Sequence, residues 1–131
     1  MNNMYVRVKG IVKKEDEYLV LKRWVDDKIP DPFVWEFIDG EINHGESPDD
    51  AIKRIVHESM GVDCGISKLI YTWSNMIGDT QCVGIAYLLN VEDEDFNLHE
   101  DFGEWAWITR DEFEYYIENR YVLKDLDGVE L

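Results

Sequence analysis

Three charged residues recur at four-residue steps in the segment that follows Gly45. Asp50, Arg54 and Glu58 fall on one side of a helix with this spacing, because residues four apart are neighbours on a helical surface. The loop before this helix runs from Gly40 to Gly45, and glycine tolerates the sharp backbone turns that such a loop needs. A loop that delivers backbone amides to a helix N-terminus is a ready site for an anion. The segment therefore predicts an anion site beside a charged helix face.

The sequence also predicts where this helix begins and ends. Ser47 is a good N-cap, Pro48 suits the first helical position, and Gly61 ends the helix. On the other side of the helix, apolar residues recur at three- and four-residue steps, which predicts a face packed against a core. The apolar positions are Ile52, Ile55, Val56 and Met60.

The segment from Gly40 to Val62 resembles the box that defines the Nudix family of nucleoside-diphosphate-linked hydrolases. The matching positions, without a gap, are Gly40, Glu46, Arg54, Val56, Glu58, Gly61 and Val62. The preceding residues, from Trp35, are similar to the family's Trp-Glu-Phe-Pro-Gly-Gly entry, with Ile38 and Asp39 in place of the proline and the first glycine. The resemblance implies an α/β/α sandwich with a mixed central sheet, and diphosphate hydrolysis with Mg²⁺ or Mn²⁺.

Two positions depart from the family pattern. The first and last of the three box glutamates are replaced by Ile55 and Ser59, so Glu58 is the one that remains. In the family, the three carboxylates project from one helical face and hold divalent cations against the substrate diphosphate. Magnesium keeps several waters and is often held by one or two carboxylates plus substrate phosphates, so one carboxylate still permits a site. Without the family, Ile55 is simply part of the apolar stripe.

The expected site follows from the box and from loops outside it. The implied catalytic residues are Glu58, Arg54, Glu100 and Asp101, and the implied metal ligands are Glu58, Asp39 (through its backbone), Glu46 and Glu104. Gly40 is an implied substrate contact, and Arg23 is a candidate phosphate contact because its guanidinium can bind two oxygens. The alternatives are structural: Glu58 can simply pair with Arg54, Glu46 can serve as a charge near the helix N-terminus, and the loop acids can be solvated.

Composition limits the possible partners. The chain has 131 residues, 45% hydrophobic and 13% aromatic, which predicts one globular domain over residues 1–131. Its formal charge of −16 argues against nucleic acid, because phosphate binding relies on basic surface. The charge is uneven: residues 1–28 hold seven Lys or Arg against five acids, whereas residues 90–131 hold three against fourteen. A surface for a small diphosphate is therefore expected in the N-terminal third together with the box helix.

Location and assembly are constrained less. No stretch approaches the ~20 apolar residues that a membrane span needs, and the N-terminus lacks the apolar run of a signal peptide. We therefore expect a cytoplasmic protein without a membrane partner. Cys64 and Cys82 are expected to be free thiols. A dimer is compatible with the sequence, which does not set the oligomeric state.

The order of expected elements indicates an α/β fold. Strands are expected at 5–12, 18–25, 33–38, 66–73, 81–91 and 105–108, with turns at 13–17 and 74–80 and loops at 26–33 and 98–104. Thr109 and Glu112 form a capping-box pattern before a second helix whose apolar face holds Phe113, Tyr116 and Ile117. The residues from Tyr121 onward give no assignment. This order predicts a mixed sheet with helices packed against it.

Two functions remain open from the sequence. The first, which we favour at this point, is a Nudix-type pyrophosphatase that cleaves a small nucleoside-diphosphate-linked substrate with water activated beside a divalent cation. Loss of two box glutamates would impair it. The second is a catalytically inactive domain that keeps the fold and binds a ligand or a protein partner, and Ile55 and Ser59 motivate it.

Overall fold

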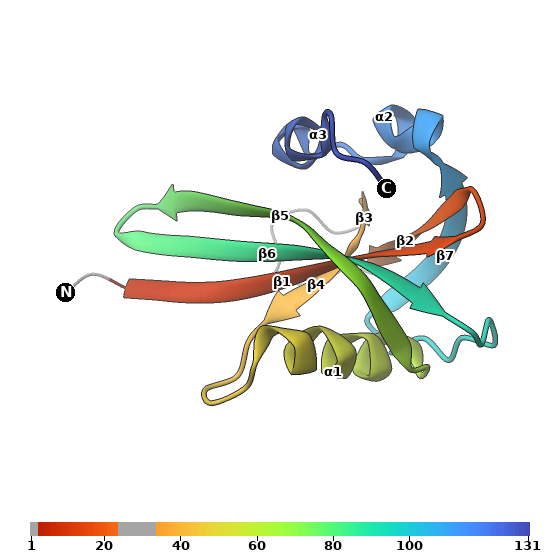
Figure 1. Ribbon diagram of the computed structural model, residues 1–131, viewed down its shortest axis with the longest axis horizontal. Coiled ribbons are helices and arrows are strands. Elements are labelled where there is room, and N and C mark those ends of the chain that lie inside the picture. The colour runs from red at the N-terminus through yellow and green to blue at the C-terminus, as the bar shows by residue number, and fades with distance from the viewer. Residues whose placement is uncertain (1–2, 24–33) are drawn as a thin grey trace.

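The computed structural model describes residues 3–23 and 34–131, so Trp24, Val25 and the expected loop 26–33 lie outside the described residues. The elements are β1 Asn3–Lys14, β2 Glu17–Arg23, β3 Trp35–Glu36, β4 Ile38–Glu41, α1 Pro48–Met60, β5 Cys64–Ile77, β6 Thr80–Val91, β7 Phe102–Thr109, a 3-10 turn Arg110–Glu112, α2 Phe113–Tyr116 and α3 Arg120–Leu126. The strands form a central layer with α1 on one side and α2 and α3 on the other (Figure 1). The predicted α/β/α sandwich is confirmed.

The sheet is mixed, as predicted. Its strand order is β3-β2-β1-β6-β5, with β4 paired to β1 and β7 paired to β2. β1 and β6 run parallel, whereas β5 and β6 form an antiparallel hairpin at one edge. The long β1, which carries the N-terminal basic residues, therefore lies at the centre of the sheet and pairs with both β4 and β6.

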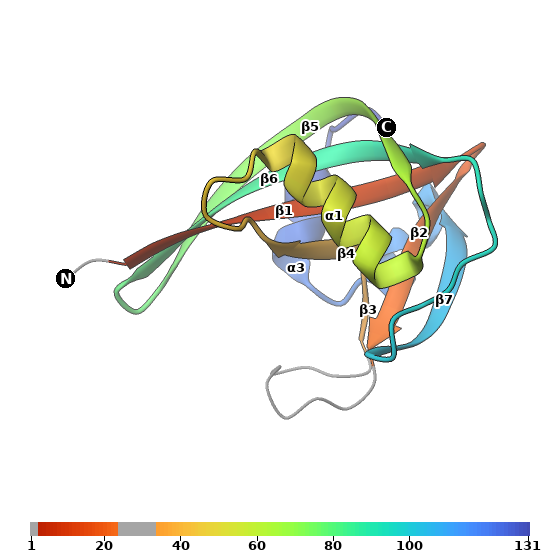
Figure 2. The same ribbon diagram turned by 90° about the horizontal axis from the view of Figure 1, so that it is seen from below.

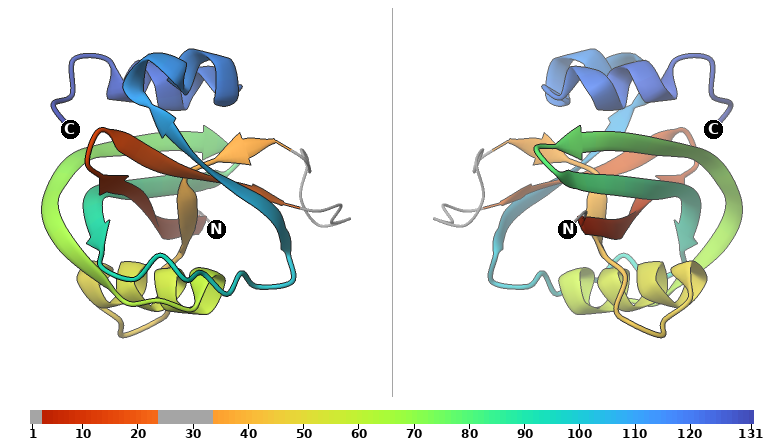
Figure 3. Two further views of the ribbon diagram at one scale, coloured as in Figure 1. Left: turned by 90° about the vertical axis from the view of Figure 1, so that its right-hand side faces the viewer. Right: turned by 90° about the vertical axis from the view of Figure 1, so that its left-hand side faces the viewer.

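A hydrophobic core lies on each side of the sheet. The core beneath α1 includes Val8, Ile38, Ile52, Met60 and Leu89. The core beneath α2 and α3 includes Ile11, Tyr18, Phe37, Phe113 and Leu126. Figure 2 shows α1 lying across the strands, and Figure 3 shows the three layers from the ends of the molecule. Each helix layer thus covers its own face of the same sheet.

Local end signals fix α1 where the sequence places it. The Ser47 hydroxyl accepts a hydrogen bond from the Asp50 backbone N–H at 3.1 Å. Gly61 adopts the left-handed region with φ 71°, and its N–H donates to the His57 carbonyl at 2.9 Å. The predicted helix boundaries are confirmed.

The second predicted cap is confirmed in a shorter element. The Thr109 backbone N–H and hydroxyl both lie 3.0 Å from the Glu112 carboxylate, but the chain forms a 3-10 turn there before the single turn of α2. Phe113 and Ile117 are buried, as expected from the apolar pattern.

Several boundaries differ from the prediction because strand pairing extends them. β5 continues to Ile77, so the expected turn 74–80 shrinks to Gly78 and Asp79. β7 begins at Phe102, inside the expected loop 98–104, because it pairs with β2. The expected single strand at 33–38 is two strands, with β3 paired to β2 and β4 paired to β1.

The C-terminal segment, unassigned from the sequence, forms α3. Asn119 is its N-cap, and its side-chain oxygen accepts hydrogen bonds from the Tyr121 and Val122 amides. Cys64 and Cys82 are free, as expected. Among the residues described, no helix is both long and apolar enough to cross a membrane.

Candidate functional site

Arg54 is the centre of a hydrogen-bond network on α1. Its Nε lies 2.9 Å from Glu46 Oε2 and its Nη2 3.1 Å from Glu46 Oε1, a bidentate pair. Nη2 also donates to the Glu41 carbonyl at 2.8 Å, and Nη1 lies 3.2 Å from Glu58 Oε2. The hydrogen bond from Arg54 and a second from the Asn43 backbone N–H hold the pKa of Glu46 below its usual value. Arg54 therefore ties the box loop to the helix.

Ile55 packs against the box loop. Its side chain is 6% exposed and belongs to the core beneath α1. A Cβ added to Gly40 would lie only 2.7 Å from Ile55 Cδ1, so Gly40 is the residue that permits this close approach. The interpretation of Ile55 as part of the apolar stripe is confirmed. Hydrocarbon thus occupies the position of the first box glutamate, next to the backbone that was expected to offer a carbonyl to a metal.

Glu58 points away from that core. Its side chain is 62% exposed, and its contact in the described structure is the ion pair with Arg54. The loop before β7 does reach the end of α1, since the Asn97 N–H donates to the Met60 carbonyl and the His99 N–H to the Ser59 carbonyl, both at 2.8 Å.

Glu100 and Asp101 of that loop do not form a metal site with Glu58, and neither does Glu104, which was expected in the loop but lies in β7. Glu100, Asp101 and Glu104 are exposed, and Asp101 pairs with His99 at 3.3 Å. Within residues 3–23 and 34–131, no three His, Cys, Asp or Glu side chains gather where they could hold a metal ion. With Ile55 buried against Gly40, the donor set does not fit the expected Mg²⁺ or Mn²⁺ site. The metal and catalytic roles of these residues remain predictions.

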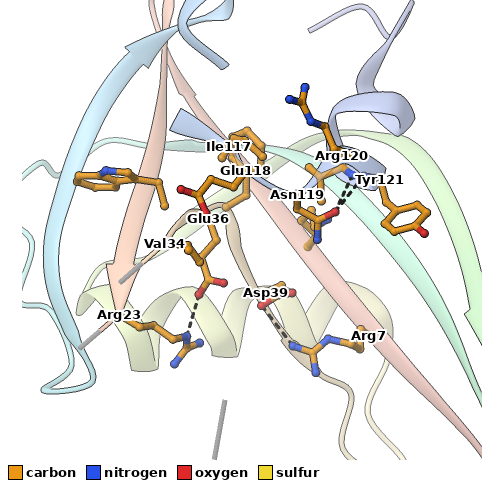
Figure 4. A pocket seen from close by; sticks show the side chains of 14 residues that line it. Arg7, Arg23, Val34, Glu36, Asp39, Ile117, Glu118, Asn119, Arg120 and Tyr121 are labelled. Carbon is orange, nitrogen blue, oxygen red and sulfur yellow. Dashed lines mark hydrogen bonds and ion pairs between the residues drawn. The ribbon is translucent and has the colours of Figure 1, made fainter. Parts of the chain in front are cut away.

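A pocket of about 760 Å³ lies between the N-terminal strands and α3 (Figure 4). It combines cationic, acidic and aromatic side chains. Its lining residues include Arg7, Lys9, Arg23, Trp35, Glu36, Phe37, Asp39, Glu118, Asn119, Arg120 and Tyr121. The expected residues Arg23 and Asp39 are here, whereas Gly40, Glu46, Arg54, Glu58, Glu100, Asp101 and Glu104 do not line it.

The pocket opens on the face of the sheet opposite α1. In β4, Ile38 and Gly40 face α1, so Asp39 between them points to the other side. Lys9 is the Cα partner of Asp39 across the β1–β4 pair and shares its face. The box helix and the pocket are therefore separated by the sheet itself.

Two ion pairs line the pocket (Figure 4). Arg7 Nη2 lies 3.2 Å from Asp39 Oδ1, and Arg23 Nε lies 2.8 Å from Glu36 Oε1. Burial raises the pKa of Glu36, and the nearby Asp39 adds to this, while the Arg23 partner opposes it. Each acid facing the pocket from β3 and β4 is thus neutralised by an arginine.

Lys9 also lines the pocket. It is 7% exposed, and its Nζ lies 4.6 Å from the centre of the Trp73 ring. Burial lowers its pKa. Lys9, Arg7 and Glu36 were not among the site residues predicted from the sequence. The signal that could have found the two cations is the alternate spacing of Arg7 and Lys9, which puts both on one face of β1.

The described architecture matches known proteins. A family model described as "NUDIX domain" matches residues 4–126. Among solved structures, the ORF135 protein of E. coli has a TM-score of 0.79 at 19% identity, covering 97% of this chain and 89% of that one. The MutT protein of Methanosarcina mazei Go1 has a TM-score of 0.80 at 17% identity, covering 95% and 90%.

A further solved structure extends the same likeness. An Ap4A hydrolase of C. elegans, solved as a binary complex, has a TM-score of 0.75 at 16% identity and covers 94% of this chain and 93% of that one. No curated protein matches the chain. At these identities the solved structures show the fold, and the family match spans nearly the whole sequence. The chain therefore belongs to the Nudix family.

Proposed function

We propose that this chain is a Nudix-fold binding protein that holds a small anionic ligand of the diphosphate type in the pocket beneath α3, without metal-assisted hydrolysis by its box. The observation that carries the proposal is the burial of Ile55 against Gly40. Where the family's chemistry needs a carboxylate beside the loop backbone, this chain has a packed hydrocarbon side chain. The alternative named from the sequence, a domain that keeps the fold and loses the chemistry, is thus the better supported one.

The chemistry of the pocket supports an anionic ligand. Although the chain carries a formal charge of −16, this pocket gathers four cations, Arg7, Lys9, Arg23 and Arg120. Three acids also line it, and two of them are paired with arginines. A locally positive cavity in a strongly acidic protein favours a small anion over a polyanion, which the rest of the surface would repel.

The size and the apolar wall support an organic ligand. Trp35, Phe37 and Tyr121 line the pocket, and Tyr121 is 80% exposed at its rim. The volume of about 760 Å³ lies within the range of about 300–1,000 Å³ typical of small-molecule sites. A flat ring system against these aromatics, joined to a phosphate-type group near the cations, fits this lining.

A second function, hydrolysis, has one observation in its favour. The His99–Ser59 hydrogen bond docks the loop that carries Glu100 and Asp101 on the last turn of α1, near Glu58. A rearrangement of exposed carboxylates there could bring ligands for Mg²⁺ or Mn²⁺ together, and the activity would be that of an impaired pyrophosphatase.

Binding and turnover measurements separate the two functions. We expect calorimetry with excess EDTA to detect binding of ADP, pyrophosphate or Ap4A, and we expect no metal-dependent release of phosphate or monophosphate from any of them. Turnover by the unmodified protein with Mg²⁺ or Mn²⁺ that is lost in Glu58→Gln would overturn the proposal in favour of the hydrolase. Absence of binding to every probe would also refute it.

A gain-of-function variant sharpens the test. In Ile55→Glu/Ser59→Glu, both missing carboxylates return to the box. We expect Mn²⁺ to raise the melting temperature of this variant and to leave that of the unmodified protein unchanged, because a ligand bound by the folded state stabilises it. An equal Mn²⁺ effect on both proteins would show that the unmodified box already binds the ion.

A further inference from the structure

A buried lysine without a carboxylate partner stands at the floor of the pocket. Lys9 is more than nine-tenths buried, and burying an ammonium group is costly unless it is paired and hydrogen-bonded. Its nearest acid across the β1–β4 pair, Asp39, is held by Arg7 at 3.2 Å. Among the described residues, Lys9 makes no ion pair and no side-chain hydrogen bond. The Lys9 Nζ atom is not among the fully buried atoms without a partner, so it is open to the pocket that Lys9 lines. Its three N–H donors are therefore available to a ligand there.

The contact with Trp73 does not satisfy those donors. The indole lies flat over Gly84, where a Cβ would come within 2.0 Å of the ring, and Nζ of Lys9 lies 4.6 Å from the ring centre. A cation–π contact stabilises the charge, but it accepts no conventional hydrogen bond. The ring therefore positions the ammonium group and leaves its donors available.

A buried polar group without a partner lies in the same row of the sheet. Lys9 and Tyr71 are both Cα partners of Ala86, from β1 and β5 on its two sides. The Tyr71 hydroxyl is buried and has no hydrogen-bond partner. The same two acids, Asp39 and Asp125, act electrostatically on both groups, so the two share one environment. Buried polar groups are nearly always partnered, so this exception beside Lys9 points to a missing polar partner in that row.

We propose that Lys9 is the residue that anchors the anionic group of the pocket's ligand, a compact phosphoryl-type group, in place of a divalent cation. The inference rests on the proposed function and names the residue that makes it possible without a metal. Arg7 and Arg23 already pair with Asp39 and Glu36, whereas Lys9 has no ion-pair partner among the described residues. A ligand oxygen at Lys9 would receive the donors that the protein leaves unused, and the aromatic wall would receive the rest of the ligand.

The chain supplies a matched control for this test. Lys22 also lies over a tryptophan, with Nζ 4.8 Å from the Trp35 ring, but it does not line the pocket. The variants are Lys9→Met, Lys9→Arg and Lys22→Met, each titrated with pyrophosphate and with ADP in excess EDTA. We expect Lys9→Met to weaken binding at least about tenfold, the loss typical of a hydrogen bond to a charged group. Lys9→Arg should retain most of the affinity, and Lys22→Met should bind like the unmodified protein.

The melting temperature of Lys9→Met distinguishes a binding role of Lys9 from a structural role, because the two roles predict changes of opposite sign. If Lys9 is kept for binding, replacing this buried ammonium group, which makes no ion pair, by the apolar Met should raise the melting temperature while binding falls. A lower melting temperature together with weaker binding would assign Lys9 to the packing and overturn the inference.

The outcomes separate the two proposals. If the unmodified protein binds neither probe in EDTA, the proposed function fails and takes the inference with it. If it binds and Lys9→Met binds equally well, the inference alone fails. Should Lys9→Met not fold, the Lys9 Nζ resonance of the isotope-labelled unmodified protein decides: a shift on addition of pyrophosphate supports the anchor, and an unchanged resonance refutes it.

Discussion

Polar side chains on the two faces of the central sheet differ in how completely they are hydrogen-bonded. On the α1 face, Arg54 donates hydrogen bonds to Glu46, to Glu58 and to the Glu41 carbonyl. On the α3 face, the Tyr71 hydroxyl is buried without a hydrogen-bond partner, and Lys9 lines the pocket without an ion-pair partner among the described residues. A satisfied network stabilises a fold, whereas unsatisfied buried groups cost stability and indicate a binding role.

The box residues can be divided into those that match the family pattern and those that depart from it. Gly40, Glu46, Arg54 and Gly61 match the family, and each has a structural task here: close approach, ion pairing or helix termination. The two departures, Ile55 and Ser59, fall at positions where the family holds metal. The four matching residues therefore contribute to the structure of this chain.

The largest effect should come from placing charge on the satisfied face. Ile55→Glu puts a carboxylate among apolar side chains against Gly40, and we expect a loss of about 3 kcal/mol in the free energy of unfolding. Because burial would raise the pKa of the new group, the loss should grow as pH rises above about 4.3, where the unfolded state ionises. Urea unfolding at pH 4 and pH 7 measures it. Ile55→Leu is the control, and an equal loss in both variants would contradict the assignment.

Arg54→Ala should have the next largest effect. It removes the donor to the Glu41 carbonyl, and from this hydrogen bond we expect a loss of about 1 kcal/mol in the free energy of unfolding. It also removes the partner of Glu46. Arg54 keeps the pKa of Glu46 low in the folded state, so this contribution is present above the unfolded pKa and lost as pH falls through the folded value. The difference in the free energy of unfolding between Arg54→Ala and the unmodified protein, measured by urea titration, should thus shrink below pH of about 4. Lys53→Ala, exposed on the same helix, should be near neutral.

Two tyrosines compare the faces directly. The Tyr87 hydroxyl, on the α1 side, donates to Asp49 Oδ1 at 2.7 Å, whereas the Tyr71 hydroxyl has no partner. Tyr87→Phe should cost about 1 kcal/mol, and Tyr71→Phe should be neutral or stabilising, because it removes an unsatisfied buried group. Thermal melts of both variants measure this. If Tyr71→Phe were the more destabilising change, the contrast between the faces would be wrong.

The same tyrosine predicts an alkaline effect. Burial, with the Asp49 hydrogen bond, raises the pKa of Tyr87 to about 12. Above pH of about 10 the unfolded state loses this proton while the folded state retains it, so stability should fall as pH rises. Tyr87→Phe should show a shallower decline between pH 9 and 11 in urea titrations. An unchanged slope would show that Tyr87 does not contribute to the loss of stability at alkaline pH.

The smallest expected effect is at Ser59. Its contact with the loop before β7 uses the backbone carbonyl, which accepts from the His99 N–H at 2.8 Å. Ser59→Ala keeps that carbonyl, so the free energy of unfolding should change by less than about 0.5 kcal/mol. Calorimetric melting checks this value, and a large loss would show that the side chain has a structural role of its own.

Local rules were sufficient for the box segment. The start and end of α1 depend on Ser47 and Gly61, whose hydrogen bonds reach no further than one helical turn. The burial of Ile55 likewise follows from its place in the apolar stripe. Such features are predictable because the interacting residues are close in the sequence.

The pocket could not be predicted in the same way. Arg23 was named from its chemistry, but Lys9 becomes significant only because β1 pairs with β4 and places it beside Asp39. The opposite wall comes from α3, at the far end of the chain, which the sequence left unassigned. Neighbours of this kind depend on strand register and helix docking, which no short spacing encodes.

The family, the sandwich and the capped helix could be predicted from the sequence, because periodicity and caps act over a few residues and the box spans one continuous segment. The close packing of Ile55 against Gly40, and the pocket that Lys9 lines on the other side of the sheet, are visible only in the folded chain. Burial and ion pairing depend on groups that folding brings together from distant parts of the chain.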